Sequence, residues 1–317
     1  MFVKSNTPSL QRLSLIKRAD IRYFYIGNLC LRQGKFKKAL ISYYQALKTA
    51  GNKVRRSWPE KTWSENGFLV DCKYHLLYCP IPKVAHSSFF QVFISLSDLE
   101  NKEEIIAAGS QLLHENANKL LLAHYKHEEA QAIIHHSGYL KFVIVRNPWE
   151  RLASGYLHCF VRMRADRRAL LSCAQEVIKT VYENQGLKPD YEKSITFRQL
   201  VEYLCATENK DLNLHWKPQY LFLGSANLDF IGRMEKLNED FEYIKQKTNL
   251  SLDLPEINKT VTASFSGNSH NYQDAYPSEL IQLEIYPSCR ELYTPELIKL
   301  VKQRYREDIE LFGYKFS

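Results

Sequence analysis

The chain has 317 residues, of which 45% are hydrophobic and 25% charged, with 12 glycines and 11 prolines. This composition excludes a disordered or fibrous protein, and the length suits one α/β domain of about 250 residues with a small appendage, or two ordinary domains. The net charge of +8 suits an anionic ligand, but it is also common among ordinary globular proteins. No basic run interleaved with aromatic residues and no zinc-finger spacing is present, so nucleic acid is not an expected partner.

Cysteine usage and hydropathy bear on the cellular compartment. The seven cysteines are odd in number and include no CxxC pair, which favours a reducing compartment over a disulfide framework. The first 20 residues lack the apolar run of a signal peptide, and no stretch of about 18 apolar residues follows. We therefore expect a soluble, cytoplasmic protein without an integral membrane segment.

Residues 1–60 are predicted to form a small helical segment. Helices are expected over residues 20–32 and 36–49, because small and aromatic residues recur there at the offsets of a tetratricopeptide helix pair. One such repeat cannot bury its own apolar face, so it should pack on the next domain, on a degenerate repeat, on a protein partner or on a second copy of the chain. A hairpin that merely packs is the alternative. The pattern is carried by Gly27, Gly34, Phe36, Ala39, Tyr43 and Ala46.

A polar stretch over residues 51–68 marks the predicted domain boundary. Beyond it, residues 68–317 are expected to fold as an α/β domain, because short apolar strands alternate with helices. This order predicts a mostly parallel sheet flanked by helices, with ligands bound beyond the carboxyl ends of the strands. The expected strand segments are 74–82, 139–146 and 228–235, followed by helices over 87–96, 148–160 and 238–247.

The last predicted helix has clear end signals. Thr294 is a suitable N-cap, Pro295 suits the first helical position, and the helix is expected to run to Leu311 before Gly313 ends it.

The stretch CPIPKVAHSSFF, residues 79–90, is the first candidate anion site. A buried strand ends at Cys79, prolines stiffen the loop that holds Lys83, and Ser87 and Ser88 open a helix. Helix-start N–H groups, two hydroxyls and an ammonium would converge on one point, which favours a bound anion. A purely structural loop is the alternative.

The stretch KFVIVRNPWERLASGY, residues 141–156, repeats this arrangement. Arg146 stands at the end of the strand, Pro148 starts the helix, and Ser154 lies two turns further on. An arginine offers a forked donor that matches a phosphate monoester. Arg146 in a salt bridge, with Ser154 as an incidental helix residue, is the alternative for this stretch alone.

Two anion sites at neighbouring strand ends together suit a ligand with phosphates at two separated positions. The only Gly-Lys dipeptide, Gly34-Lys35, precedes Phe36 rather than Ser or Thr, so no Walker loop is present. A nucleoside-triphosphate site therefore lacks its main sequence signal.

These motifs resemble those of the carbohydrate sulfotransferases of the chondroitin and HNK-1 type and their bacterial relatives. PIPKVAHSS is similar to the 5'-phosphosulfate loop, and VRNPWERLASGY to the 3'-phosphate motif. The similarity covers residues 74–315 in the family's order. It continues through NLHWKPQY, LDFIGRMEKLNEDFEYI, LPEINKT and TPELIKLVKQRYREDIELFGY.

The resemblance implies a phosphosulfate-binding α/β fold related to the P-loop nucleotide kinases. It implies sulfuryl transfer from 3'-phosphoadenosine 5'-phosphosulfate to a carbohydrate hydroxyl, without a metal, and adenosine 3',5'-bisphosphate as product. The implied 5'-phosphosulfate loop comprises Pro82, Lys83, Val84, Ala85, His86, Ser87 and Ser88. Arg146 and Ser154 would hold the 3'-phosphate, and Asn258 and Thr260 resemble a late loop that closes over the nucleotide.

The chain departs from the family in three places. His86 stands where relatives usually have a small residue or cysteine, and Asn147 replaces the usual acidic residue after the arginine. The cysteine pair that animal relatives carry after HWxPQ is missing, and LFLGSA stands there. The missing pair agrees with a reducing compartment.

Sulfuryl transfer needs a group that removes the acceptor hydroxyl proton, and His or Glu would serve near neutral pH. Our choice is His215, beside Trp216, whose ring could stack against a sugar. A hydrogen-bonded core histidine is the alternative for that position, and Glu235 and His86 are the next candidates for the base.

The remaining patterns are weaker. His124 and His127 lie one helical turn apart and His135 adjoins His136, but no third ligand follows at a recognisable spacing, so no metal site is expected. The run RMRADRR, residues 162–168, could attract an acidic glycan or form a solvated helix end. An ATP-dependent phosphotransferase and a catalytically silent scaffold remain alternative functions.

Overall fold

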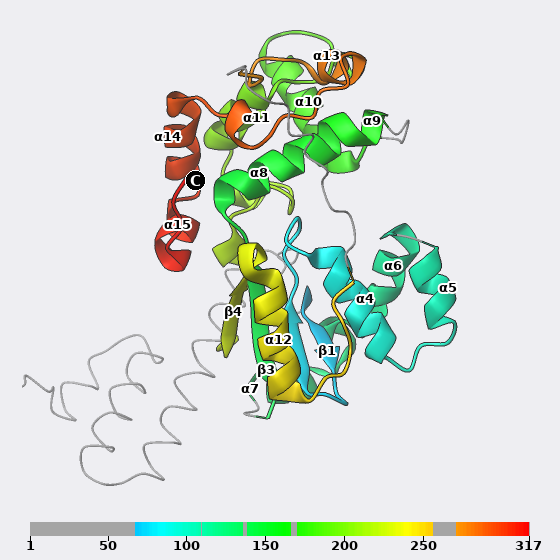
Figure 1. Cartoon of the computed structure of the whole chain (residues 1–317). Coiled ribbons are helices and arrows are strands. Elements are labelled where there is room, and N and C mark those ends of the chain that lie inside the picture. The colour runs from blue at the N-terminus through cyan, green and yellow to red at the C-terminus, as the bar shows by residue number, and fades with distance from the viewer. Residues whose placement is uncertain (1–66, 109, 136–137, 166–169, 256–270, 317) are drawn as a thin grey trace, which may run out of the picture. The chain divides into compact units, whose positions relative to one another are not determined.

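The computed structural model describes residues 67–108, 110–135, 138–165, 170–255 and 271–316 (Figure 1). The predicted helix pair in residues 1–60 lies outside the described residues, and so do Asn258 and Thr260. The described part of the chain is an α/β domain, which confirms the predicted class.

The sheet has four strands in the order β1-β2-β3-β4: β1 Leu69–Asp71, β2 Leu76–Cys79, β3 Leu140–Val145 and β4 Phe230–Arg233. Strands β2, β3 and β4 are parallel, as predicted, with Cys79 paired to Val143 and Val145 to Arg233. The carboxyl ends of β2 and β3 therefore meet at one edge. Strand β1 pairs antiparallel with β2 and was not predicted, because three residues carry too little alternation to be recognised.

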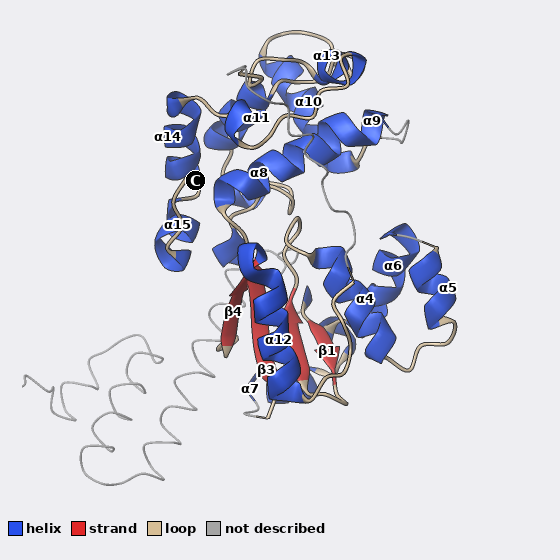
Figure 2. Ribbon diagram, viewed as in Figure 1, coloured by secondary structure: helices blue, strands red, loops and turns tan. Residues whose placement is uncertain are grey.

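Helices cover this sheet, and the strands lie together beneath the larger group of helices in Figure 2. Helix α12 (Leu237–Thr248) packs on β3 and β4, and α4 (His86–Leu96) follows β2 directly. Tyr78 of β2 stacks on Phe89 of α4 and on Phe142 of β3, with ring centroids 4.6 and 5.0 Å apart. Each such pair contributes about 0.5–1.5 kcal/mol beyond its buried area, so α4 is seated firmly at the strand end.

A second hydrophobic core lies among the helices drawn above the strand ends in Figure 1. Helix α8 (Pro148–Tyr156) runs through it and continues as a π-helical turn, η4 (Leu157–Arg162). A Cβ atom at Gly155 would lie 2.9 Å from the Trp216 ring, so glycine permits the close approach of these two segments.

The remaining helices surround these two cores, and their bounds are as follows. The α-helices are α5 Lys102–Ala107, α6 Ser110–Ala117, α7 His127–His135, α9 Met163–Ala165, α10 Ser172–Asn184, α11 Phe197–Ala206, α13 Pro277–Gln282, α14 Pro295–Arg304 and α15 Arg306–Phe312. The 3-10 turns are η2 Asn118–Leu120, η3 Leu122–His124, η5 Asn209–Asp211, η6 Gln219–Phe222, η7 Met234–Lys236 and η8 Arg290–Leu292.

The C-terminal prediction was right at both ends and wrong in the middle. The Thr294 hydroxyl accepts a hydrogen bond from the Leu297 N–H at 3.3 Å, and Gly313 ends α15 with φ 66°. Between them the helix breaks at Tyr305, whose hydroxyl donates to the Trp216 carbonyl at 2.8 Å. This buried tertiary contact outweighs the local helical pattern.

None of the described helices is both long enough and apolar enough to cross a membrane. The predicted cytoplasmic location is not tested by this finding and stays a prediction.

Candidate active site

The loop between β2 and α4 has an unusual backbone. Lys83 and Ala85 adopt left-handed conformations, with φ 70° and 46°, although neither is glycine. Such conformations cost about 1–3 kcal/mol each and often mark ligand sites. Ala85 is the N-cap of α4 and has no side-chain acceptor, so the first N–H groups of this 11-residue helix stay available. The loop is therefore shaped to receive an anion.

The Lys83 side chain is partly buried inside this loop. Burial lowers the pKa of Lys83; the Cys159 thiol opposes this shift, and the neighbouring Arg146 adds to it. Among the described residues, Lys83 forms no ion pair. A bound anion would favour the charged ammonium, so the lysine is suited to stabilise negative charge that arrives with a ligand.

The structure brings Arg146 to the same place from the end of β3. Its Nη1 donates to the Lys83 carbonyl at 3.4 Å, and its Nη2 pairs with Glu150 at 3.4 Å. Both contacts are long, and the buried Nε of Arg146 has no partner among the described residues. The guanidinium thus retains donor capacity for a further acceptor, as a phosphate would supply.

The hydroxyls predicted to bind the donor are placed unequally. Ser88 is buried, whereas Ser87 and Ser154 are partly exposed. The Ser87 Oγ lies 3.2 Å from Nε2 of His114, so this hydroxyl already has a partner. Ser154 lies two turns into α8, the helix that begins beside Arg146.

Gln219 holds the backbone of Arg146 from both sides. Its Oε1 accepts from the Arg146 N–H at 2.9 Å, and its Nε2 donates to the Arg146 carbonyl at 2.8 Å. Asp308 of α15 in turn accepts from the backbone N–H groups of Gln219 and Tyr220 at 2.7 and 2.8 Å. We call the two hydrogen bonds between the Gln219 side chain and the backbone of Arg146 the Gln219 clamp. Sequence reasoning missed it, because its partners are 73 residues apart.

Arg151 connects the loop between β2 and α4 with the segment that holds His215, and sequence reasoning did not single it out. This buried guanidinium donates through Nε to the Pro82 carbonyl at 3.1 Å and through Nη1 to the Lys217 carbonyl at 2.8 Å. Its Nη2 lies 3.5 Å from the carbonyl of His215. The loop between β2 and α4, which we call the Lys83 loop, and the segment that holds His215 are therefore tied by one side chain. An arginine within an otherwise buried helix stretch was the available sequence signal.

His215 lies close to the Lys83 loop, because Arg151 contacts both. The Nδ1 atom of His215 is 2.9 Å from Oδ1 of Asn213. The His215 ring is also near enough to His86, at the start of α4, for the two to interact electrostatically. The expectation that Trp216 offers a surface for a sugar ring is wrong. Trp216 is 1% exposed and packs against Phe160, with ring centroids 6.0 Å apart, because the second core needs its volume.

The two other candidates for the base have different surroundings. Glu235 accepts from the Asn147 N–H at 2.7 Å and from the Tyr314 hydroxyl at 3.0 Å, so both carboxylate oxygens serve structural bonds. Burial, followed by the charges of His114, His215 and Lys83, lowers the pKa of His86 well below its ordinary value. His86 is therefore neutral at physiological pH.

Asn147, one of the departures from the family pattern, has a structural explanation. Its Oδ1 caps α8 by accepting from the Trp149 N–H at 3.1 Å, and its Nδ2 donates to the Lys315 carbonyl at 2.8 Å. A carboxylate could make the first bond but not the second.

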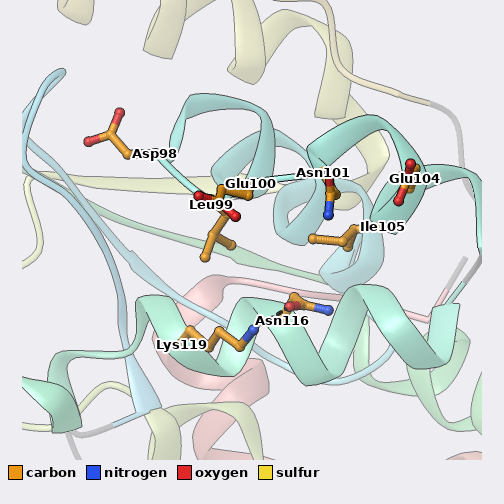
Figure 3. Close-up of a pocket in the computed structure, with 8 residues that line it drawn as sticks. All are labelled: Asp98, Leu99, Glu100, Asn101, Glu104, Ile105, Asn116 and Lys119. Atoms are coloured by element: carbon orange, nitrogen blue, oxygen red, sulfur yellow. Dashed lines mark hydrogen bonds between the residues drawn. The ribbon is translucent and has the colours of Figure 1, made fainter.

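A hollow of about 590 Å³ lies away from this site, beside α5 and α6 (Figure 3). Asp98, Glu100 and Glu104 contribute to its lining, and Lys119 bonds to Asn116 there at 2.7 Å. Its carboxylates make it unsuitable for a ligand with several negative charges. Within the described residues, no three His, Cys, Asp or Glu side chains are arranged to hold a metal ion. The expectation of metal-independent chemistry nevertheless stays a prediction.

The loops that carry Lys83 and Arg146 lie at the adjacent carboxyl ends of the parallel strands β2 and β3, an arrangement suited to an anionic ligand. Residues 66–315 match the profile of the Sulfotransferase family, and the chain belongs to that family. No solved structure matches the chain.

The chain is similar to several carbohydrate sulfotransferases. It is 28% identical to carbohydrate sulfotransferase 14 of Homo sapiens over 248 residues, which are 78% of this chain and 59% of the relative. It is 26% identical to carbohydrate sulfotransferase 11 of Mus musculus over 237 residues, 69% of this chain and 64% of the relative. The chain thus spans about three fifths of the length of these relatives.

Proposed function

We propose that this protein transfers a sulfuryl group from 3'-phosphoadenosine 5'-phosphosulfate to a hydroxyl of a carbohydrate acceptor. The observation that carries the proposal is the contact between Nη1 of Arg146 and the carbonyl of Lys83, with the buried Nε of Arg146 left free of described partners. Two cationic groups at one strand edge match a nucleotide that carries a phosphate on each side of its ribose. The names of the related carbohydrate sulfotransferases support the acceptor class.

In this proposal the loop of residues 82–88 binds the 5'-phosphosulfate, and Arg146 and Ser154 bind the 3'-phosphate. Left-handed residues can turn backbone N–H groups toward an anion, and Lys83 and Ala85 both have left-handed backbones. Asn258 and Thr260 complete the donor site by family resemblance alone.

The acceptor hydroxyl oxygen attacks sulfur, its proton passes to His215, and the bond between sulfur and the phosphate oxygen breaks. Lys83 stabilises the charge that develops on the departing phosphate oxygen. Arg146 and the α4 N-terminus hold the nucleotide in place, so the reaction depends mainly on positioning and electrostatics. Adenosine 3',5'-bisphosphate leaves as the product.

The test is sulfate transfer from labelled donor to a panel of glycans by wild type and Lys83→Ala. We expect Lys83→Ala to lower the rate by about 10²–10³-fold, since one positioned donor at a developing charge contributes this much, while donor binding weakens only modestly. Lys179→Ala is the matched control, because Lys179 is exposed on α10 and its one ion pair among the described residues is with Glu183. A Lys83→Ala rate near that of wild type would refute the mechanism.

Binding experiments separate this function from an ATP-dependent phosphotransferase. Adenosine 3',5'-bisphosphate should bind to the wild type and lose affinity in Arg146→Gln, whereas ATP should bind weakly to both. Tight ATP binding that is independent of Arg146 would favour the phosphotransferase. Bisphosphate binding without sulfate transfer to any acceptor would favour a silent binding protein.

A further inference from the structure

Asn213 and His215 form a small turn at the edge of the candidate active site. The Oδ1 of Asn213 accepts a hydrogen bond from the backbone N–H of His215 at 3.1 Å. The same Oδ1 lies 2.9 Å from Nδ1 of the His215 ring. One amide oxygen therefore faces two nitrogen atoms of a single histidine.

The backbone contact decides which amide atom faces the ring. A backbone N–H can only donate, so the atom of Asn213 that meets it must be the carbonyl oxygen and not the NH2 group. That oxygen cannot donate to the ring, so the contact at 2.9 Å requires Nδ1 to carry the proton. In a neutral imidazole the other nitrogen, Nε2, then carries the lone pair.

The other groups around the ring leave this arrangement in place. The Cys173 thiol of α10 is within hydrogen-bonding reach of His215, but a thiol is a weak donor and acceptor. The hydrogen bond with Cys159, together with burial, raises the pKa of Cys173, so this thiol stays uncharged. His86 is neutral, as described above. The contact between the Arg151 guanidinium and His215 is with the backbone carbonyl of His215, at 3.5 Å, and not with the ring. Among the described groups, none would accept a hydrogen bond from a protonated Nε2 as well as Asn213 accepts one from a protonated Nδ1. The surroundings therefore favour the Nδ1–H tautomer.

We propose that Asn213 is a positioning residue that holds His215 in its Nδ1–H tautomer, so that Nε2 is the atom that accepts the proton of the attacking hydroxyl. This inference rests on the proposed sulfuryl transfer. As the oxygen–sulfur bond forms, the hydroxyl proton moves to Nε2, and the imidazolium keeps its Nδ1–H bond to Asn213. The imidazolium then loses a proton to solvent before the next turnover. A hydrogen-bond acceptor on one ring nitrogen is an established means of fixing a catalytic tautomer.

The test reads the tautomer and the activity separately. The chain is labelled with ¹⁵N-histidine, and the His215 signals are assigned from their loss in His215→Gln. At a pH where the ring is neutral, we expect the wild type to show a protonated Nδ1 and an unprotonated Nε2. In Asn213→Leu this preference should be lost, and Asn213→Ala provides the same comparison if the leucine variant does not fold.

Activity should follow the tautomer. We expect Asn213→Leu to lower kcat by about 10- to 100-fold with little change in the donor KM, because general-base catalysis contributes about 10²–10⁴-fold in total. Asn213→Asp keeps the acceptor oxygen, so it should retain the Nδ1–H tautomer and a higher kcat than Asn213→Leu. Asn227→Leu, on an exposed loop, is the matched control and should behave as the wild type.

A wild-type ring protonated at Nε2, or the same tautomer in wild type and Asn213→Leu, would overturn the inference. A fall in kcat with no change of tautomer would overturn it equally. If the tautomer behaves as expected but no acceptor is sulfated, the proposed function fails, the proton-transfer step fails with it, and Asn213 is shown only to set the tautomer of His215.

Discussion

The Gln219 clamp offers a direct test of whether the two anion loops depend on tertiary positioning. Replacement Gln219→Leu keeps a similar volume but removes both bonds to Arg146, the acceptor at 2.9 Å and the donor at 2.8 Å. Gln219 is fully buried, so water cannot readily take the place of either bond. The variant leaves one N–H and one carbonyl of Arg146 without their partner.

The expected loss follows from these two groups. An unsatisfied buried donor or acceptor costs about 1–3 kcal/mol, so the free energy of unfolding should fall by about 2–6 kcal/mol. Ligand binding should also weaken, because part of the binding free energy must then be spent on ordering Arg146. If about 1.4 kcal/mol is needed for that step, the Kd for adenosine 3',5'-bisphosphate rises about tenfold.

Urea unfolding and calorimetric titration with the bisphosphate measure the two effects. Gln199→Leu is the matched control, because Gln199 accepts from the Thr196 N–H at 2.9 Å in the capping box of α11. The control should lose about 1 kcal/mol of stability and bind the bisphosphate with unchanged Kd. A Gln219→Leu variant that is destabilised but keeps the wild-type Kd would refute the positioning of Arg146 by the clamp.

Two further predictions concern Arg151 and His86. Arg151→Lys keeps the charge, but a lysine cannot reach the carbonyls of Pro82 and Lys217 together. We expect urea unfolding to show a loss of stability of about 2–4 kcal/mol, and activity assays to show a lower kcat. Wild-type values of both would contradict the role of Arg151. In the folded state the pKa of His86 lies well below the ordinary value of 6.5. As the pH drops below about 6.5, the unfolded state therefore binds the proton before the folded state does, and the free energy of unfolding falls. Urea unfolding between pH 5 and 7 measures how steeply the free energy of unfolding changes with pH. His86→Phe should lower this slope by up to about 1.4 kcal/mol per pH unit. An unchanged slope would show that His86 is not held neutral.

Local sequence patterns were sufficient to predict much of the donor site. A buried strand followed by a tight loop and a helix start recurs at Lys83 and at Arg146, and each pattern lies within about 16 neighbouring residues. Because the carboxyl ends of parallel strands share one edge, the prediction that both loops lie together needed no further information. The contact between Arg146 and the Lys83 carbonyl agrees with that expectation.

Other features depend on contacts that have no local pattern. The helix breaks at Tyr305, whose hydroxyl bonds to a carbonyl 89 residues away in the chain, and the Trp216 ring is buried by packing against Phe160 in the second core. Arg151 binds backbone carbonyls, which every residue possesses, so the sequence does not mark its partners. The left-handed conformations of Lys83 and Ala85 could not be expected either, since non-glycine residues rarely adopt them.

The sequence by itself determined the family, the α/β class, and the cationic side chains that stand at the ends of two parallel strands. Only the tertiary structure decided how these side chains are held. Gln219 holds the backbone of Arg146, and Arg151 joins the Lys83 loop to the His215 segment. The physical reason is the range of the interactions. Strand and helix patterns arise between close neighbours in the chain, whereas buried polar groups take their partners from whichever segment the packed core brings beside them.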